Sequence, residues 1–195
     1  MSIEVRRLAL IVEGHGEVES CPVLVRRIAQ ELGRAVQVLH PIRVPKSRLL
    51  RPGEMERALE LALRKLQGFG AIMVLLDADD DCVKVAGVRE LIRARRHVHL
   101  PVAVVYAVRE YEAWFLAGLE ALQGRRQIRA GVDAPQNPES ISGAKEYLQR
   151  CLEPGRHYAE TVDQPALTQL MDLDLVRTRS RSFDKFWREL ERLLG

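Results

Sequence analysis

Apolar side chains follow two patterns along the first part of the chain. Residues 8–12, 71–76 and 101–108 are continuous apolar runs, which is typical of strands buried on both faces. Residues 18–32 and 55–66 instead carry apolar side chains every three or four positions, which predicts helices with one buried side. This alternation predicts an α/β fold, Rossmann-like, with a mainly parallel sheet and helices on both faces.

Two more elements complete the alternation. Residues 36–44 alternate between apolar and polar or small positions, which predicts a further strand. Pro41 lies within this strand and favours the edge of the sheet, because proline cannot donate a ladder hydrogen bond. Residues 85–92 have the apolar spacing of a helix.

The pattern changes after the last of these strands. Residues 111–122 predict one more helix, and residues 123–142 have the glycine, proline and asparagine content of a loop. We expect two or three helices after this loop, the last with apolar residues at helical spacing over 183–193. The expected organisation is an α/β core over residues 1–120 and a helical C-terminal extension packed on it over residues 121–195.

Composition narrows the functional classes only slightly. Of the 195 residues, 47% are hydrophobic and 29% are charged, as in an ordinary globular protein. Only 5% are aromatic, so we do not expect the stacking of bases on exposed rings to dominate any nucleic-acid binding. A net charge of +3 does not by itself indicate a polyanionic partner.

The cysteines and the apolar segments bear on the cellular compartment. Cys21, Cys82 and Cys151 lie far apart and form no C-x-x-C pair, which argues against a disulfide framework or a zinc knuckle. No segment approaches the roughly 20 apolar residues of a membrane helix, and no signal-peptide core is visible. These features predict a cytoplasmic protein with no membrane partner.

Acidic side chains follow two of the predicted strands. The first strand leads into a turn with Glu13 and Glu17, and the run at 71–76 leads into Asp77, Asp79 and Asp81. The carboxyl ends of parallel strands lie at one edge of a sheet, so these carboxylates are expected to converge. Their repulsion would be offset by a divalent cation, and carboxylate oxygens are ligands that Mg²⁺ and Mn²⁺ prefer. The sequence therefore predicts a metal site at this edge.

Each acidic group also has a structural explanation. Glu17 would favour the N-terminus of the helix that follows it, and the aspartates after Asp77 would cap the next helix. A third pair, Glu110 and Glu112, follows the strand at 101–108, where a ligand role and a helix-capping role are both open. Capping leaves Glu13 unexplained, which favours the metal hypothesis.

Basic residues are also unevenly distributed. Arg43, Lys46 and Arg48 fall close together in a stretch without acids, and Lys84 follows the second acidic cluster. These side chains are candidates for binding the phosphates of a nucleic acid. The alternative is an ordinary solvated surface.

The acidic motifs resemble those of the Toprim domain, the catalytic fold of topoisomerases, primases and OLD-type nucleases. In that fold a glutamate in a glycine turn follows the first strand, and Asp-x-Asp follows the third. Glu13 with Gly14 matches the first motif, and Asp77 with Asp79 matches the second. Glu17 is similar to the second glutamate of the E-x-x-x-E arrangement in the OLD-type branch.

Two later segments, 110–117 and 158–183, resemble an uncharacterised bacterial family with OLD-like Toprim domains. Some members of that family are nuclease partners of ATPases in anti-phage defence. The resemblance covers nearly the whole chain, and it implies an OLD-like nuclease that hydrolyses phosphodiester bonds of DNA or RNA. The ATPase part of a full OLD protein is missing from this sequence, which implies activity that is self-contained or that depends on a separate ATPase subunit; a homo-oligomer also stays open.

The resemblance also implies roles for the acidic residues, with two Mg²⁺ or Mn²⁺ ions at the site. Glu13, Asp77 and Asp79 are the expected catalytic residues and would hold the first ion. Glu17, with Asp81 or Glu112, would hold the second. Glu13 has an alternative role in proton transfer.

Two other functions stay open. One is a non-catalytic Toprim-like subunit that binds nucleic acid or a partner ATPase. The other is a phosphotransferase or phosphatase on a receiver-like fold, with Asp77 as the nucleophile. It ranks lower, because the first-strand acid is a glutamate and the usual lysine after a later strand is not evident.

Overall fold

The computed structural model describes residues 5–49, 51–78 and 98–195. The strands are β1 (Arg6–Val12), β2 (Val36–Val38), β3 (Ile42–Arg43), β4 (Ala71–Ala78) and β5 (Val102–Val108). The helices up to the loop at 123–142 are α1 (His15–Glu31), α2 (Lys46–Leu49), α3 (Glu54–Leu66), α5 (Glu112–Ala117) and α6 (Leu119–Leu122). A short 3₁₀ helix η1 (Pro138–Ser140) precedes α7 (Ala144–Cys151), α8 (Glu160–Leu170), α9 (Leu173–Arg179) and α10 (Arg181–Leu194). The helix predicted over 85–92 lies outside the described residues.

The strands form one parallel sheet, which confirms the predicted α/β class. Its order is β2-β1-β4-β5, and β3 also pairs with β1. The segment 36–44 lies at the sheet edge, as predicted, but it forms two short strands instead of one. Residues 39–41 separate the two strands. Pro41 lies in this gap and has no N–H group with which to continue the hydrogen bonds of the sheet.

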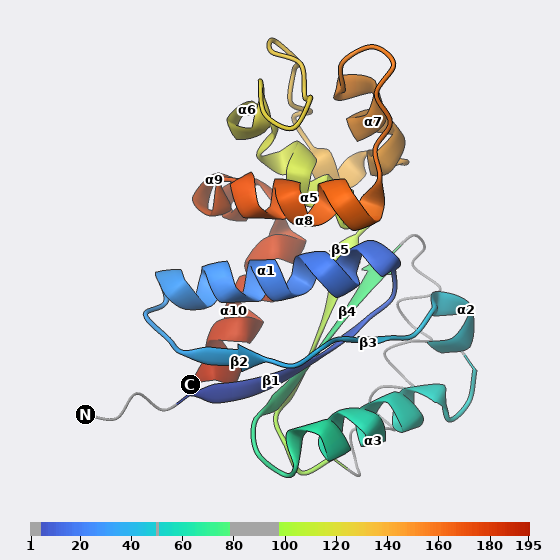
Figure 1. Ribbon diagram of the computed structural model, residues 1–195, viewed down its shortest axis with the longest axis vertical. Helices are drawn as coiled ribbons and strands as arrows, with labels where there is room; N and C mark the ends of the chain where they lie inside the picture. The colour runs from blue at the N-terminus through green and yellow to red at the C-terminus, as the bar shows by residue number, and fades with distance from the viewer. Residues whose placement is uncertain (1–4, 50, 79–97) are drawn as a thin grey trace.

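Alternate residues of β1 face opposite sides of the sheet, as the pleat requires. Leu8 and Leu10 belong to the apolar cluster with α1 and α10, whereas Ala9 and Ile11 belong to the cluster with α3. Figure 1 shows α1 on one side of the sheet and α3 on the other. Burial on both faces explains why the apolar runs are continuous.

The helix predicted over 111–122 is interrupted at Gly118, which separates α5 from α6. A Cβ atom at Gly118 would lie 2.7 Å from Cγ2 of Val176, on α9. The lack of a side chain therefore lets α9 approach closely. After the loop, the described chain contains four helices, so the prediction of two or three was too low.

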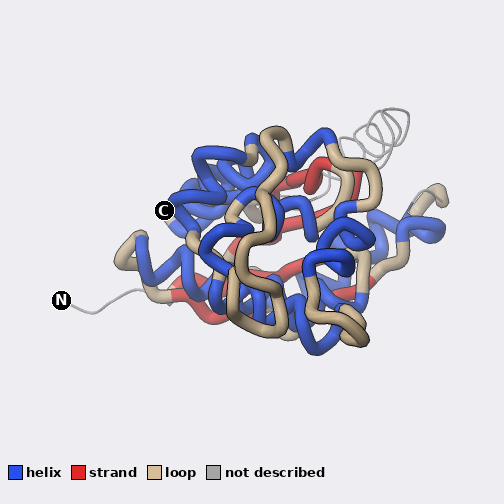
Figure 2. Tube along the Cα trace, turned by 90° about the horizontal axis from the view of Figure 1, so that it is seen from above, coloured by secondary structure: helices blue, strands red, loops and turns tan. Residues whose placement is uncertain are grey.

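The later helices share a core with the sheet. The apolar cluster on the α1 side continues through Trp114 to Phe183 and Phe186 of α10. Helix α8 packs along α1, and α10 packs on β5. Seen from above in Figure 2, the strands run between helices. The expected domain boundary at residue 120 stays a prediction.

None of the helices within the described ranges is long and apolar enough to cross a membrane.

Candidate functional site

The structure brings Glu13 and Asp77 together at the carboxyl ends of β1 and β4. The parallel register pairs Val12 with Leu75, so the residues that follow lie side by side. Oε2 of Glu13 accepts a hydrogen bond from the main-chain nitrogen of Asp77 at 3.4 Å. The prediction that these two residues lie together at one edge of the sheet is therefore confirmed.

Glu17 lies in the first turn of α1 and is only 6% exposed. Its carboxylate folds back on the helix start and accepts hydrogen bonds from the main-chain nitrogens of Glu17 itself and Gly14. Any Cβ at Gly14 would collide with this carboxylate. Burial raises the pKa of Glu17, the two main-chain hydrogen bonds lower it, and repulsion from Glu13 adds to the rise. Glu17 is thus both a helix cap and a member of the acidic edge.

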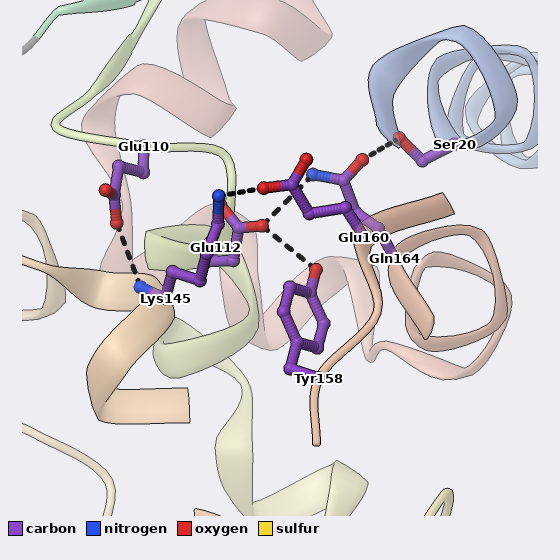
Figure 3. Close-up of polar contacts among 7 residues, drawn as sticks. All are labelled: Ser20, Glu110, Glu112, Lys145, Tyr158, Glu160 and Gln164. Carbon is purple, nitrogen blue, oxygen red and sulfur yellow. Dashed lines mark hydrogen bonds and ion pairs between the residues drawn. The ribbon is translucent and has the colours of Figure 1, made fainter. Parts of the chain in front are cut away.

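Glu112, in the first turn of α5, is a buried carboxylate with two hydrogen-bond donors (Figure 3). Its Oε1 accepts from the Tyr158 hydroxyl at 2.9 Å and from Nε2 of Gln164 at 3.3 Å. Burial raises its pKa and the nearby charge of Glu17 adds to the rise, whereas Lys145 lowers it. Four acidic residues are thus linked in turn, Asp77 to Glu13 through a main-chain hydrogen bond, and Glu13 to Glu17 and Glu17 to Glu112 through the repulsion of their charges. We call Asp77, Glu13, Glu17 and Glu112 the acidic line.

Lys145 places a cation beside the acidic line. Its ammonium pairs with Glu160, and its charge lowers the pKa of both Glu17 and Glu112. Its main-chain nitrogen donates to Oε2 of Glu110 at 2.9 Å, so Glu110 satisfies one amide at the start of α7. Sequence analysis did not select Lys145, because its partners come from distant parts of the chain.

Gln164 joins the acidic line to α1 and was also missed. While Nε2 donates to Glu112, Oε1 accepts from the Ser20 hydroxyl at 2.9 Å. Gln164, Ser20 and Glu112 are all buried, at the joint between α8, α1 and α5. A Cβ at Gly16 would collide with Oε1 of Gln164, so the glycine in this helix turn was the one local signal of the joint.

Two arginines lie near the same edge. Arg43, at the end of β3, donates from Nη1 to the main-chain oxygen of Glu13 at 3.3 Å. Arg109, directly after β5, has a φ of 71°, a backbone conformation that is uncommon for residues other than glycine. The main-chain nitrogen of Arg109 donates a hydrogen bond to the main-chain oxygen of Ala78 at 3.3 Å, which joins the ends of β4 and β5.

The other predicted residues are placed as follows. Arg48 pairs with Glu54 at 2.8 Å and is thereby directed to the start of α3. Lys46 lies in α2, and its side chain is not described. Three predicted residues lie outside the described part of the chain: Asp79, Asp81 and Lys84.

The donor chemistry at this edge fits a hard divalent cation. Glu13, Glu17 and Asp77 present carboxylate oxygens, and these are the ligands that Mg²⁺ and Mn²⁺ take. Among the residues that the structure describes, no three acidic, histidine or cysteine side chains are already grouped as a formed metal site. Two of the six predicted ligands, Asp79 and Asp81, are outside that set.

Comparisons with known proteins place the chain in a family. Neither the curated proteins nor the solved structures that were searched contain a match. The family model described as a domain of unknown function (DUF4276) matches residues 12–191, which include the acidic line, helices α7, α8 and α9, and most of α10. A match over most of the chain shows the relationship, so the protein belongs to the DUF4276 family.

Proposed function

We propose that this protein is a metal-dependent nuclease of the Toprim and OLD-like kind, which hydrolyses phosphodiester bonds of DNA or RNA. The observation that carries the proposal is the meeting of Glu13 and Asp77 at one sheet edge, joined by the 3.4 Å hydrogen bond. Glu17 extends the same edge. Acidic side chains at strand ends suit a cation that binds a phosphoryl oxygen.

Each group at the edge has a part in this proposal. Glu13, Asp77 and Asp79 would hold a Mg²⁺ or Mn²⁺ ion. The ion would supply Lewis-acid chemistry and lower the pKa of bound water. Arg43, exposed beside Glu13, adds positive charge where a substrate phosphate would arrive. A role in anti-phage defence beside a separate ATPase subunit belongs to the same proposal.

One observation favours a second candidate, a non-catalytic subunit that binds nucleic acid or an ATPase. The Glu17 carboxylate already caps α1, and the Glu112 carboxylate is already held by Tyr158 and Gln164. Both residues therefore have structural roles without any metal. The proposed nuclease would then depend on Glu13 and Asp77 together with the aspartates after β4.

The test is cleavage of plasmid DNA and of a structured RNA, with Mg²⁺, with Mn²⁺ and with EDTA. We expect the wild type to cut in the presence of metal, and Glu13→Gln and Asp77→Asn to abolish cutting. Glu153→Gln is the matched control, because it removes an exposed carboxylate from the loop between α7 and α8. Equal cutting by all four proteins would identify a contaminating nuclease.

A metal titration separates the two candidates. Binding of Mn²⁺ by the wild type that is lost in Asp77→Asn supports the nuclease. A protein that binds nucleic acid in EDTA and shows no metal binding supports the non-catalytic subunit.

A further inference from the structure

We propose that Gln164 is a positioning residue of the acidic line, and that the seating of α8 on α1 thereby sets the affinity of this edge for its cation. This inference rests on the proposed function and adds a way to regulate it. A partner or substrate that moved α8 away from α1 would weaken metal binding without touching a ligand.

The contacts of Gln164 carry the proposal. This side chain is 2% exposed and uses both ends of its amide, donating to Glu112 and accepting from Ser20. Three segments, α1, α5 and α8, are thereby joined through one planar group, as Figure 3 shows. An amide whose two ends are both engaged fixes the orientation of the groups that it bonds.

The position of Glu112 matters to the rest of the acidic line. The charge of Glu17 raises the pKa of Glu112, and the charge of Glu13 raises the pKa of Glu17. Gln164 also occupies the Cβ position of Gly16, the residue directly before Glu17 on α1. The Tyr158 hydroxyl holds the same Oε1 atom of Glu112 from a second side. The carboxylate therefore cannot turn unless Gln164 or Tyr158 releases it.

Gly16 shows how closely the two helices are fitted at this joint. It lies in the first turn of α1, where a Cβ atom would collide with Oε1 of Gln164. Alanine is ordinarily the better helix former, so glycine here is explained by the space that the amide occupies. The same two helices also carry apolar residues of one cluster, such as Leu24 on α1 and Leu167 on α8. An apolar side chain at position 164 could therefore make a hydrophobic contact in place of the hydrogen bonds. A buried polar joint whose groups are hydrogen-bonded holds its members in one arrangement, which apolar packing alone would not specify.

The first experiment compares wild type with Gln164→Leu and Gln123→Leu. Gln123 is the matched control, because it also uses both amide ends, donating to the Val132 oxygen at 2.8 Å and accepting from the Gly131 nitrogen at 2.7 Å. The dissociation constant for Mn²⁺ is measured by titration well below the melting temperature, and folding is followed in EDTA. We expect about a tenfold weaker Mn²⁺ binding for Gln164→Leu, as for other residues that orient metal ligands, and no change for Gln123→Leu.

The second experiment approaches the joint from α1 and stays informative if Gln164→Leu does not fold. Gly16→Ala should weaken Mn²⁺ binding in the wild-type background. Gly16→Ala should have little further effect in a Gln164→Ala background, because the Gln164 amide that would collide with the new methyl group is absent. Additive effects of the two substitutions would overturn the proposal.

The outcomes separate this inference from the proposed function. A wild type that binds no Mn²⁺ and cuts no nucleic acid defeats both. A wild type that binds Mn²⁺, with Gln164→Leu and Gly16→Ala binding it equally well, defeats this inference alone. Equal weakening by Gln164→Leu and Gln123→Leu would mean that lost stability is the cause, and would also reject the positioning role.

Discussion

Glu17 on α1 and Glu112 on α5 repel one another inside the protein. The two residues are 6% and 3% exposed, and burial raises the pKa of each carboxyl group above the ordinary value of 4.5. The charge of Glu17 raises the pKa of Glu112 further. Burial and repulsion therefore both favour the protonated form of these groups, and the cost of ionising them depends on pH.

The pH dependence of stability follows from these shifts. At a pH between 4.5 and their raised pKa values, Glu17 and Glu112 keep their protons in the folded protein, whereas an unfolded glutamate loses its proton. The folded state then binds more protons, so the stability contributed by these groups is full below pH 4.5 and is lost as pH rises through their raised pKa values. In EDTA, the free energy of unfolding of Glu112→Gln, measured relative to that of the wild type, should therefore increase as pH rises to neutral. Urea unfolding at several pH values measures this difference, and a difference that stays constant with pH would contradict it.

Lys145→Met should make the stability of the protein depend more strongly on pH, whereas Glu112→Gln should weaken this dependence. The Lys145 charge lowers the pKa of both Glu17 and Glu112, so its loss raises both values further. The stability of the variant in EDTA should then fall more steeply with pH than that of the wild type. Lys185→Met, which removes an exposed lysine of α10, is the control and should keep the wild-type slope. Equal slopes for Lys145→Met and the control would show that Lys145 does not act on these carboxylates.

A bound cation should stabilise the folded protein through the same acidic line. If Mg²⁺ binds, a concentration about 100 times its dissociation constant adds about 2.7 kcal/mol to the free energy of unfolding. For a chain of this size that corresponds to roughly 5–10 °C in melting temperature. Asp77→Asn should melt higher than the wild type in EDTA, because it removes a negative charge beside Glu13, and should not respond to Mg²⁺. A less stable Asp77→Asn, together with a wild type that ignores Mg²⁺, would assign these acids a structural role.

The sequence predicted the sheet edge because the relevant signals are local. Continuous apolar runs identify β1, β4 and β5, and the acids that end β1 and β4 follow directly. Parallel topology then brings Glu13 and Asp77 together, since strands of one direction end at one edge. This placement follows without any contact between distant side chains.

The joint around Glu112 could not be predicted in this way. Tyr158 and Gln164 reach Glu112 from 46 and 52 residues away, and Ser20 reaches Gln164 across 144 residues. Nothing in the spacing of these polar residues distinguishes them from a solvated surface. The break at Gly118 was missed for the same reason, because Val176, which explains it, comes from another helix.

Ser182 offers a test of how the final helix is joined to the core. Its Oγ accepts hydrogen bonds from the indole Nε1 of Trp114 at 2.8 Å and from the main-chain nitrogen of Val108 at 3.3 Å. Ser182→Ala leaves the buried indole N–H without this acceptor, which costs about 1–3 kcal/mol. Urea unfolding should show this loss. The control Ser140→Ala removes an exposed hydroxyl that donates to the Asn137 oxygen, and should cost much less. Equal stabilities of the two variants would refute the role of Ser182.

Gly118 tests the close approach of α9. Gly118→Ala places a methyl group against Val176, and such overpacking costs about 1–3 kcal/mol even though alanine favours helix. The cost should shrink in a Val176→Ala background, where the obstructing methyl group is absent. Thermal melts of the four proteins in this cycle measure the coupling. A Gly118→Ala variant more stable than the wild type would show that the break between α5 and α6 has another cause.

The position of α10 has a consequence for how the protein is made. This helix packs on β5 and α1, yet it is synthesised long after both of them. Until residues 181–194 emerge, the apolar side chains that face them on β5 have no cover, although that strand was synthesised many residues earlier. The nascent chain must therefore pass through a stage with an open hydrophobic surface, on which general chaperones would act. Ribosome-bound chains that stop just before α10 should bind such chaperones, and chains that continue well past it should release them.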